Sequence, residues 1–324
     1  MKQMGRRVFV LFLFGGLLGW AVPAMADWVP KKPVDFVIMA GKGGGADRMA
    51  RLMQTIIEKH KFSPKPFIPI NKPGGSGAES LIHLKQKSGD NHTVMVTLNS
   101  FYTTPLRQPN LKVDIATFTP VGRMAEDTFV LWVNAETSIK SVVDFVKAAK
   151  AKGNGWIMAG TGKGQEDQLL TSFLNSAYGL NMKYVPYKGG GRVAKELAGK
   201  HADSTVNNPS EQLGFYAAGK TRPLAAFTPT RLPMFKDTPT FKELGKDFVY
   251  FMQRSVVGAP GMSAEAAGFY RRVFAQVYAS EEWQQYMEKK SLLGGFMTAQ
   301  MLKKYWATEK KIHATMLKDI GEIK

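Results

Sequence analysis

The sequence predicts an α/β fold, and two features of the chain carry that prediction. Short runs rich in valine, isoleucine and phenylalanine alternate with longer runs whose apolar residues recur at helical spacing. Glycine-rich loops follow several of the short runs and precede the next helical run. This order is typical of a parallel sheet flanked by helices, in which ligands bind beyond the carboxyl ends of the strands.

The first set of elements ends near residue 100. Its helical run at 46–61 is amphipathic, with Met49, Met53 and Ile56 on one face. Asp47 lies in the first turn of this run, where a carboxylate complements the helix dipole. We expect strands at 33–38, 67–70 and 93–98, and helices at 46–61 and 78–87.

A second, similar set of elements follows. Ser141 and Asp144 have the spacing of a capping box at the start of one helix. We expect strands at 128–133, 156–159, 182–185, 204–206 and 223–227, helices at 141–150, 166–178 and 192–198, and a mostly helical segment at 264–323. Strand-like crossings near 121–129 and 251–257 would join two lobes. We therefore predict one lobe from 27–123 plus 253–324, and a second from 124–252.

The first 26 residues have the features of a secretory signal peptide. Lys2, Arg6 and Arg7 precede an apolar run at 8–20 that is too short to span a bilayer comfortably. Small residues at 24 and 26 suit a signal peptidase, so we predict cleavage before Asp27 and export to the periplasm. An uncleaved anchor is the alternative. The chain has no cysteine, so an exported protein of this sequence must be stabilised by its core alone.

The formal net charge of +18 limits the class of partner. A nucleic-acid binder would share this sign, but the export signal and the dispersed basic residues argue against one. Steering of small anions toward the protein is one interpretation, and a solvated lysine-rich surface without a partner is the other. We expect no nucleic-acid partner, and we expect the protein to act as a monomer.

Two glycine-rich loops have the chemistry of an anion site. The first turn of a helix leaves backbone N–H groups without partners, and the helix dipole adds positive potential there. Glycine lets an oxyanion approach that backbone closely. Plain tight turns are the alternative interpretation. The loops consist of Gly41, Lys42, Gly43, Gly44 and Gly45, and of Gly74, Gly75, Ser76 and Gly77.

Enzyme signatures are missing or incomplete in the sequence. Neither loop ends in the Gly-Lys-Ser/Thr of a nucleotide P-loop, and the Gly-x-Gly fragments at 41–43 and 160–162 are weak signals of a dinucleotide site. The segment 74–78 is one residue away from the Gly-x-Ser-x-Gly of serine hydrolases, with Ser76 as its serine. The histidines lie in polar or lysine-bearing contexts, and no pair has metal-ligand spacing. We therefore expect no enzyme, no metal and no cofactor, and keep a serine hydrolase as the less favoured alternative.

A set of polar groups suited to holding a ligand remains. Each residue type alone is more often found in turns and caps, but these residues share a placement after predicted strands, which favours a binding site. Hydroxyl groups come from Ser76, Ser100 and Thr161, and amide groups come from Asn99, Gln165, Asn207 and Asn208.

Five segments match a known set of motifs. The first reads Ala-Gly-Lys-Gly-Gly-Gly-Ala-Asp at 40–47, followed by Ala-Arg at 50–51. The others read Asn-Lys-Pro-Gly-Gly-Ser-Gly at 71–77, Gly-Thr-Gly-Lys-Gly at 160–164, Val-Pro-Tyr-Lys-Gly at 185–189 and Ala-Gly-Lys-Thr-Arg-Pro-Leu-Ala at 218–225. In this combination the mature chain resembles the periplasmic solute-binding proteins of tripartite tricarboxylate transporters, the Bug type.

The resemblance implies a two-lobed, type II periplasmic-binding fold with a hinge of two crossing strands. In that family the first two loops hold one carboxylate, largely through backbone and ordered water, and the other lobe recognises the far end of the ligand. The implied function is capture of a small organic carboxylate, with di- or tricarboxylates favoured, and delivery to a membrane permease. A sensor kinase is an alternative partner. The implied ligand-binding residues are Ala40, Gly41, Lys42, Gly43, Gly44, Gly45, Gly75, Ser76, Gly77, Asn99, Ser100, Thr161, Gln165 and Asn207.

The chain also departs from the pattern of that family. Ala40 stands where a bulky aromatic residue is usual, which should widen the cleft. Lys42 and Lys163 add cations beside loops on opposite lobes, and they either face the ligand or are solvated. Glu166 and Asp167 either neutralise Lys163 or contact a cationic group on the ligand. These departures bear on the choice of ligand more than on the fold.

Overall fold

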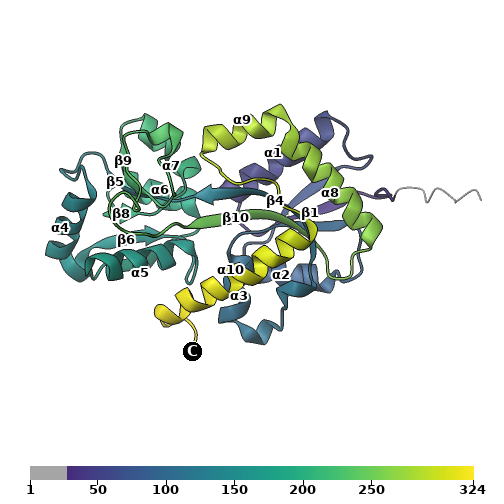
Figure 1. Cartoon of the computed structure of the whole chain (residues 1–324), viewed down its shortest axis with the longest axis horizontal. Coiled ribbons are helices and arrows are strands. Elements are labelled where there is room, and N and C mark those ends of the chain that lie inside the picture. The colour runs from purple at the N-terminus through teal and green to yellow at the C-terminus, as the bar shows by residue number, and fades with distance from the viewer. Residues whose placement is uncertain (1–27) are drawn as a thin grey trace, which may run out of the picture.

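The computed structural model describes residues 28–324. The predicted signal peptide at 1–26 and its cleavage before Asp27 lie outside the described residues. Figure 1 shows two lobes side by side, each with a sheet and its own helices. Within the described part of the chain, none of the helices combines the length and the apolar character needed to cross a membrane.

The first lobe is built on a five-stranded mixed sheet with the order β2-β1-β3-β10-β4. Its strands are β1 Val34–Ile38, β2 Phe67–Asn71, β3 Thr93–Val96, β4 Thr119–Thr128 and β10 Phe251–Gly258. β1 pairs in parallel with both β2 and β3, so that Asp35 lies between Ile68 and Thr93. The carboxyl ends of these three strands therefore meet at one edge of the sheet, as the sequence predicted.

The second lobe is built on another five-stranded mixed sheet, with the order β7-β6-β8-β5-β9. Its strands are β5 Val130–Asn134, β6 Ile157–Gly160, β7 Lys183–Pro186, β8 Ser204–Thr205 and β9 Thr221–Ala226. β6 is parallel to β7 and β8, whereas β5 is antiparallel to β8 and β9. The predicted two-lobed α/β fold with mixed sheets is confirmed.

Two crossing strands connect the lobes. β4 and β10 pair antiparallel from Thr119 and Gly258 at one end to Thr128 and Phe251 at the other. β4 continues into β5 of the second sheet after one residue, Phe129. Figure 1 shows both strands running from one lobe toward the other. The predicted hinge of two crossing strands is therefore present.

Helices cover both faces of each sheet. They are α1 Gly45–Lys59, α2 Ala78–Gln86, α3 Ser100–Arg107, α4 Val142–Lys152, α5 Glu166–Tyr178, α6 Gly190–Ala198, α7 Pro209–Ala217, α8 Ala264–Ala279, α9 Glu281–Lys290 and α10 Ala299–Asp319. α3 and α7 were not predicted from the sequence. Both are short, and each carries a proline, Pro105 inside α3 and Pro209 at the start of α7. Tertiary packing outweighs these weak local signals.

The alternation of side chains along β1 divides the core of the first lobe. Phe36 belongs to a cluster with residues of α1, α8 and α9, whereas Val37 points to the opposite face and packs with α2, α3 and α10. The second lobe has its own core, which includes Phe145 and Phe227. Leu317, near the end of α10, also belongs to that core, so α10 contacts both lobes. The residue boundaries of the lobes stay a prediction.

Candidate functional site

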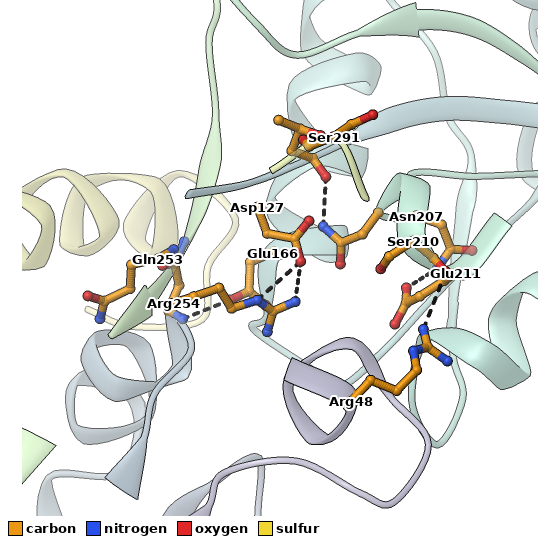
Figure 2. Close-up of polar contacts among 12 residues, drawn as sticks. Arg48, Asp127, Glu166, Asn207, Ser210, Glu211, Gln253, Arg254 and Ser291 are labelled. Atoms are coloured by element: carbon orange, nitrogen blue, oxygen red, sulfur yellow. Dashed lines mark hydrogen bonds and ion pairs between the residues drawn. The ribbon is translucent and has the colours of Figure 1, made fainter. Parts of the chain in front are cut away.

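The candidate site lies where the two lobes meet. The loops after β1, β2 and β3 approach the first turns of α5 and α7. Arg48 Nη2 donates to the carbonyl oxygen of Ser210 at 3.3 Å, and the N–H of Asn99 donates to Glu166 Oε1 at 3.1 Å. Figure 2 shows Arg48 directed toward Ser210, and Glu166 beside Arg254. The lobes are therefore in direct contact around this site.

The first glycine loop is held by the first turn of α1. The N–H of Gly43 donates to Asp47 Oδ2 at 2.9 Å, and that of Gly44 donates to the Gly41 carbonyl at 3.5 Å. Burial raises the pKa of Asp47, but hydrogen bonds from Arg51, Gly43 and other donors outweigh it and hold that pKa below its ordinary value. No acceptor among the described residues takes the N–H groups of Gly41, Lys42, Gly45 and Ala46. This loop therefore keeps the donors that an anion site requires.

The second glycine loop is a tight left-handed segment. Gly75, Ser76 and Gly77 have φ angles of 61°, 58° and 90°. Ser76 adopts a positive φ although it lacks the conformational freedom of glycine. Glycine is favoured at position 77, because a φ of 90° strains other residues and a Cβ there would lie 2.9 Å from Met39 Cγ. The N–H of Gly77 bonds within the loop, whereas those of Gly75 and Ser76 donate to no atom of residues 28–324. The donors left at this loop are therefore the N–H groups of Gly75 and Ser76.

Asn99 and Ser100 lie at the start of α3. The Asn99 side chain donates to the Phe251 carbonyl at 2.9 Å and accepts from the Gln253 N–H at 3.0 Å, so it ties this loop to β10. Ser100 Oγ is buried, has no hydrogen-bond partner among residues 28–324, and lies 3.3 Å from the position of a Cβ on Gly77. Of these two side chains, Ser100 is the one with hydrogen-bonding capacity left.

Side chains of the following turn accept hydrogen bonds from three N–H groups of the loop after β6. The N–H of Thr161 donates to Asp167 Oδ2, and the N–H of Gly162 donates to Gln165 Oε1, both at 2.7 Å. A Cβ on Gly162 would lie 3.0 Å from Ser76 Oγ, so this loop adjoins the second glycine loop. A cavity of about 650 Å³ opens beside it, lined by Thr161, Gly162, Pro186, Tyr187, Lys188 and Arg192.

The side chain of Asn207 forms its hydrogen bonds within the second lobe. Its side chain donates to Glu211 Oε2 at 2.8 Å and accepts from Gln212 Nε2 at 2.9 Å. The predicted site residue therefore holds the start of α7, as Figure 2 shows for Asn207 and Glu211. Its neighbour Asn208 donates to the Thr128 carbonyl at 2.7 Å and joins α7 to the hinge strand.

The hinge strands hold a buried ion pair that was not predicted from the sequence. Arg254 of β10 and Asp127 of β4 are 3% and 2% exposed, and Arg254 Nε and Nη2 both donate to Asp127 Oδ2. Burial lowers the pKa of Arg254, but Asp127 more than compensates, so that pKa lies above its ordinary value. The sequence did hold a signal, because Arg254 is a lone charge in the predicted crossing strand at 251–257. A charge buried in such a strand needs a partner, since unpaired charges are rarely buried.

Two buried carboxyl groups, those of Glu166 and Asp167, and the half-buried Glu211 lie on the second-lobe side. Burial raises the pKa of Glu166 and of Glu211, and burial together with the other two carboxyl groups raises the pKa of Asp167 to about 8. Lys163 does not neutralise Glu166 or Asp167, because its ion pair is with Glu322 at 3.4 Å. Lys42 is exposed and has no ion-pair partner among the described residues.

Comparisons with known proteins agree with this architecture. Residues 49–321 match the family model of the tripartite tricarboxylate transporter family receptor. Protein BugT from Bordetella pertussis strain Tohama I is 25% identical over 249 residues, which is 75% of this chain and 75% of BugT.

Two solved structures from Rhodopseudomonas palustris share the fold. Rpa4515 with adipate has a TM-score of 0.84 at 24% identity and covers 91% of this chain and 99% of its own. MatC with bound malate has a TM-score of 0.79 at 18% identity and covers 89% and 99%. Since the family model spans most of the sequence, the chain belongs to the tripartite tricarboxylate transporter receptor family, whose members are periplasmic solute receptors.

Proposed function

We propose that this protein is an exported receptor that binds a small organic carboxylate between its lobes, with di- or tricarboxylates favoured. The observation that carries the proposal is the set of N–H groups in the two glycine loops that donate to no other described atom. Backbone donors at helix starts suit carboxylate oxygens. The adipate and malate in the two related structures support the same ligand class.

The two ends of the ligand have different proposed partners. The first carboxylate lies against the two glycine loops at 40–45 and 75–77 and near Ser100. The far end enters the cavity beside Thr161, where Lys188 and Arg192 offer positive charge. Asn99, Gln165 and Asn207 act on the ligand indirectly, by holding the loops that contact it.

Binding is proposed to work by closure of the lobes. A ligand that contacts both lobes favours their closed arrangement, and β4 with β10 supplies the hinge. The closed, loaded receptor then delivers its ligand to the subunits of an inner-membrane permease. No covalent step is required, so no catalytic residue is assigned.

A ligand-stabilisation screen tests the proposal. Purified mature protein is heated with succinate, malate, adipate, citrate, glucose or putrescine, each at the same ionic strength. At least one of the acids should raise the melting temperature in a concentration-dependent way, because a ligand that binds only the folded state stabilises it. A rise with glucose or putrescine and with none of the acids would contradict carboxylate recognition.

A further inference from the structure

Arg254 is placed against the start of α1. A Cβ on Gly45, the first residue of α1, would lie 3.0 Å from Arg254 Nη2 and 3.8 Å from Asp127 Oδ2. The amino end of a helix carries partial positive charge, so a guanidinium there is repelled unless an anion is close. Asp127 provides one such anion, which explains why the three groups lie together.

Asp127 uses only part of the guanidinium. Nε and Nη2 of Arg254 both donate to a single oxygen, Asp127 Oδ2, and Nη1 donates to no atom of the described residues. The edge formed by Nη1 and Nη2 is the second edge through which a guanidinium binds a carboxylate with two parallel hydrogen bonds. Among the described residues, Asp127 therefore leaves the Nη1 position of that edge without an acceptor.

Other unused donors lie beside the same edge. The N–H groups of Gly45 and Ala46 have no acceptor among residues 28–324. Ser210 Oγ is shielded from solvent, has no hydrogen-bond partner in the described part of the chain, and lies 3.6 Å from the position of a Cβ on Gly45. Figure 2 shows Arg254 and Ser210 on opposite sides of this region, with Arg48 also directed toward Ser210. Donors from three elements thus surround one position.

We propose that Arg254 is the ionic anchor of the ligand's first carboxylate, and that Asp127 is the positioning residue that orients its guanidinium. This anchor rests on the proposed function. It replaces binding through backbone N–H groups and water alone with a direct contact between the ligand and a charged side chain. A ligand carboxylate at this position accepts from Nη1 of Arg254 and from the N–H groups that begin α1. Specificity for an acid over its neutral amide then comes from one buried side chain.

The test compares each acid with its uncharged diamide. Succinate against succinamide and adipate against adipamide are titrated by calorimetry into the wild-type protein, Arg254→Gln and Arg254→Lys. Arg254→Gln should lose about 30-fold or more in affinity for the acid, while its affinity for the diamide changes little. Arg254→Lys should recover part of the preference for the acid, because it keeps the charge and loses the paired geometry.

Two further variants separate anchoring from folding. Arg254→Gln leaves the carboxylate of Asp127 buried without its partner, which can impair folding. The double variant Asp127→Asn/Arg254→Gln removes both charges, so it should fold and still lose the preference for the acid. Arg123→Gln is the matched control, because Arg123 is also buried in a hinge strand and paired, but with Glu126. Its preference for the acid should equal that of the wild type.

The outcomes distinguish the two proposals. If the wild type binds an acid and folded Arg254→Gln or the double variant binds it equally well, the anchor is not Arg254, and the receptor function stands. If neither acid is bound by the wild type and the wider screen also finds none, carboxylate recognition itself is wrong, and the anchor fails with it.

Discussion

A glycine-rich loop precedes a helix on both sides of the site, but the backbone N–H groups of these loops have different partners on the two sides. On the first lobe, the loops after β1 and β2 leave several N–H groups without acceptors among the residues that the structure describes. On the second lobe, three N–H groups of the glycine loop after β6, those of Thr161, Gly162 and Gly164, donate to Asp167, Gln165 and Gln168 of the following turn. A glycine loop before a helix is therefore an anion site only where neighbouring side chains leave its donors unused.

The two sides of the site also differ in the charge of their side chains. Arg254 reaches the first-lobe side, whereas the carboxyl groups of Glu166, Asp167 and Glu211 lie on the second-lobe side. The carboxyl acceptors of the second-lobe side complement the donors of the first-lobe side, as the hydrogen bond from the Asn99 N–H to Glu166 shows. The difference suggests that the first lobe supplies the affinity for an anion and the second lobe limits which ligands fit.

The largest expected effect concerns α10, which joins the two sides. Leu302 lies in the core of the first lobe and Leu317 in that of the second, and both are fully buried. Leu302→Ala and Leu317→Ala should each lower the free energy of unfolding by about 3 kcal/mol, measured by urea denaturation. A negligible cost for Leu317→Ala would assign the whole of α10 to the first lobe and support the predicted boundary at 253–324.

The next effect is on binding at the first glycine loop. Gly44 has φ −76° and ψ 172°, which valine adopts readily, and a Cβ there meets only the Gly41 carbonyl at 3.5 Å. Gly44→Val should therefore keep the melting temperature but weaken acid binding by about tenfold or more, since it crowds the free N–H groups. Gly214→Val is the control, because Gly214 is exposed and a Cβ there meets nothing within 4 Å. Equal affinities in both variants would remove the first loop from the site.

A smaller effect concerns pH and the acidic second-lobe side. The pKa of Asp167 is raised to about 8 in the folded protein, so the folded state binds more protons than the unfolded state above the ordinary pKa of an aspartate. Its contribution to stability therefore falls as pH rises toward 8. Asp167→Asn should raise the melting temperature by about 3 °C at pH 8 and change it little at pH 4.

The exposed Asp144 provides a control of opposite sign. Hydrogen bonds from the Lys140 N–H and from Ser141 lower its pKa, so its stabilisation is present at neutral pH and is lost as pH falls through that lowered value. Asp144→Asn should lower the melting temperature at pH 8. If Asp167→Asn behaved in the same way, the carboxyl group of Asp167 would be stabilising in its ionised form.

The smallest expected effect is at the rim of the cavity. Lys188 is exposed and lines the cavity, whereas Lys195 on α6 is not among the residues that line it. Lys188→Ala should weaken binding of a dicarboxylate by about threefold at low salt, and the loss should vanish in 0.5 M sodium chloride, because exposed charges are screened. Lys195→Ala should show no loss at either salt concentration. A salt-independent loss in both variants would point to a change in folding.

Local pattern was sufficient to predict most of the fold. The strands beginning near 34, 67 and 93 and the helix that follows the first glycine loop are set by alternation and by helical spacing of apolar residues. The capping box at Ser141 and Asp144 is present as predicted, with the Asp144 N–H bonded to Ser141 Oγ at 3.1 Å. α3 and α7 were missed because their local preference for helix is weak and packing decides their state.

The sequence by itself determined the two sets of alternating elements, the glycine loops and the strand ends at which they lie, because these depend on neighbours along the chain. Only the tertiary structure decided which polar groups remain unused. Arg254 finds Asp127 across 127 positions, and the Asn99 N–H finds Glu166 across 67. Hydrogen bonds of this kind depend on distances that folding creates, so the residue types name the candidates and the folded partners select among them.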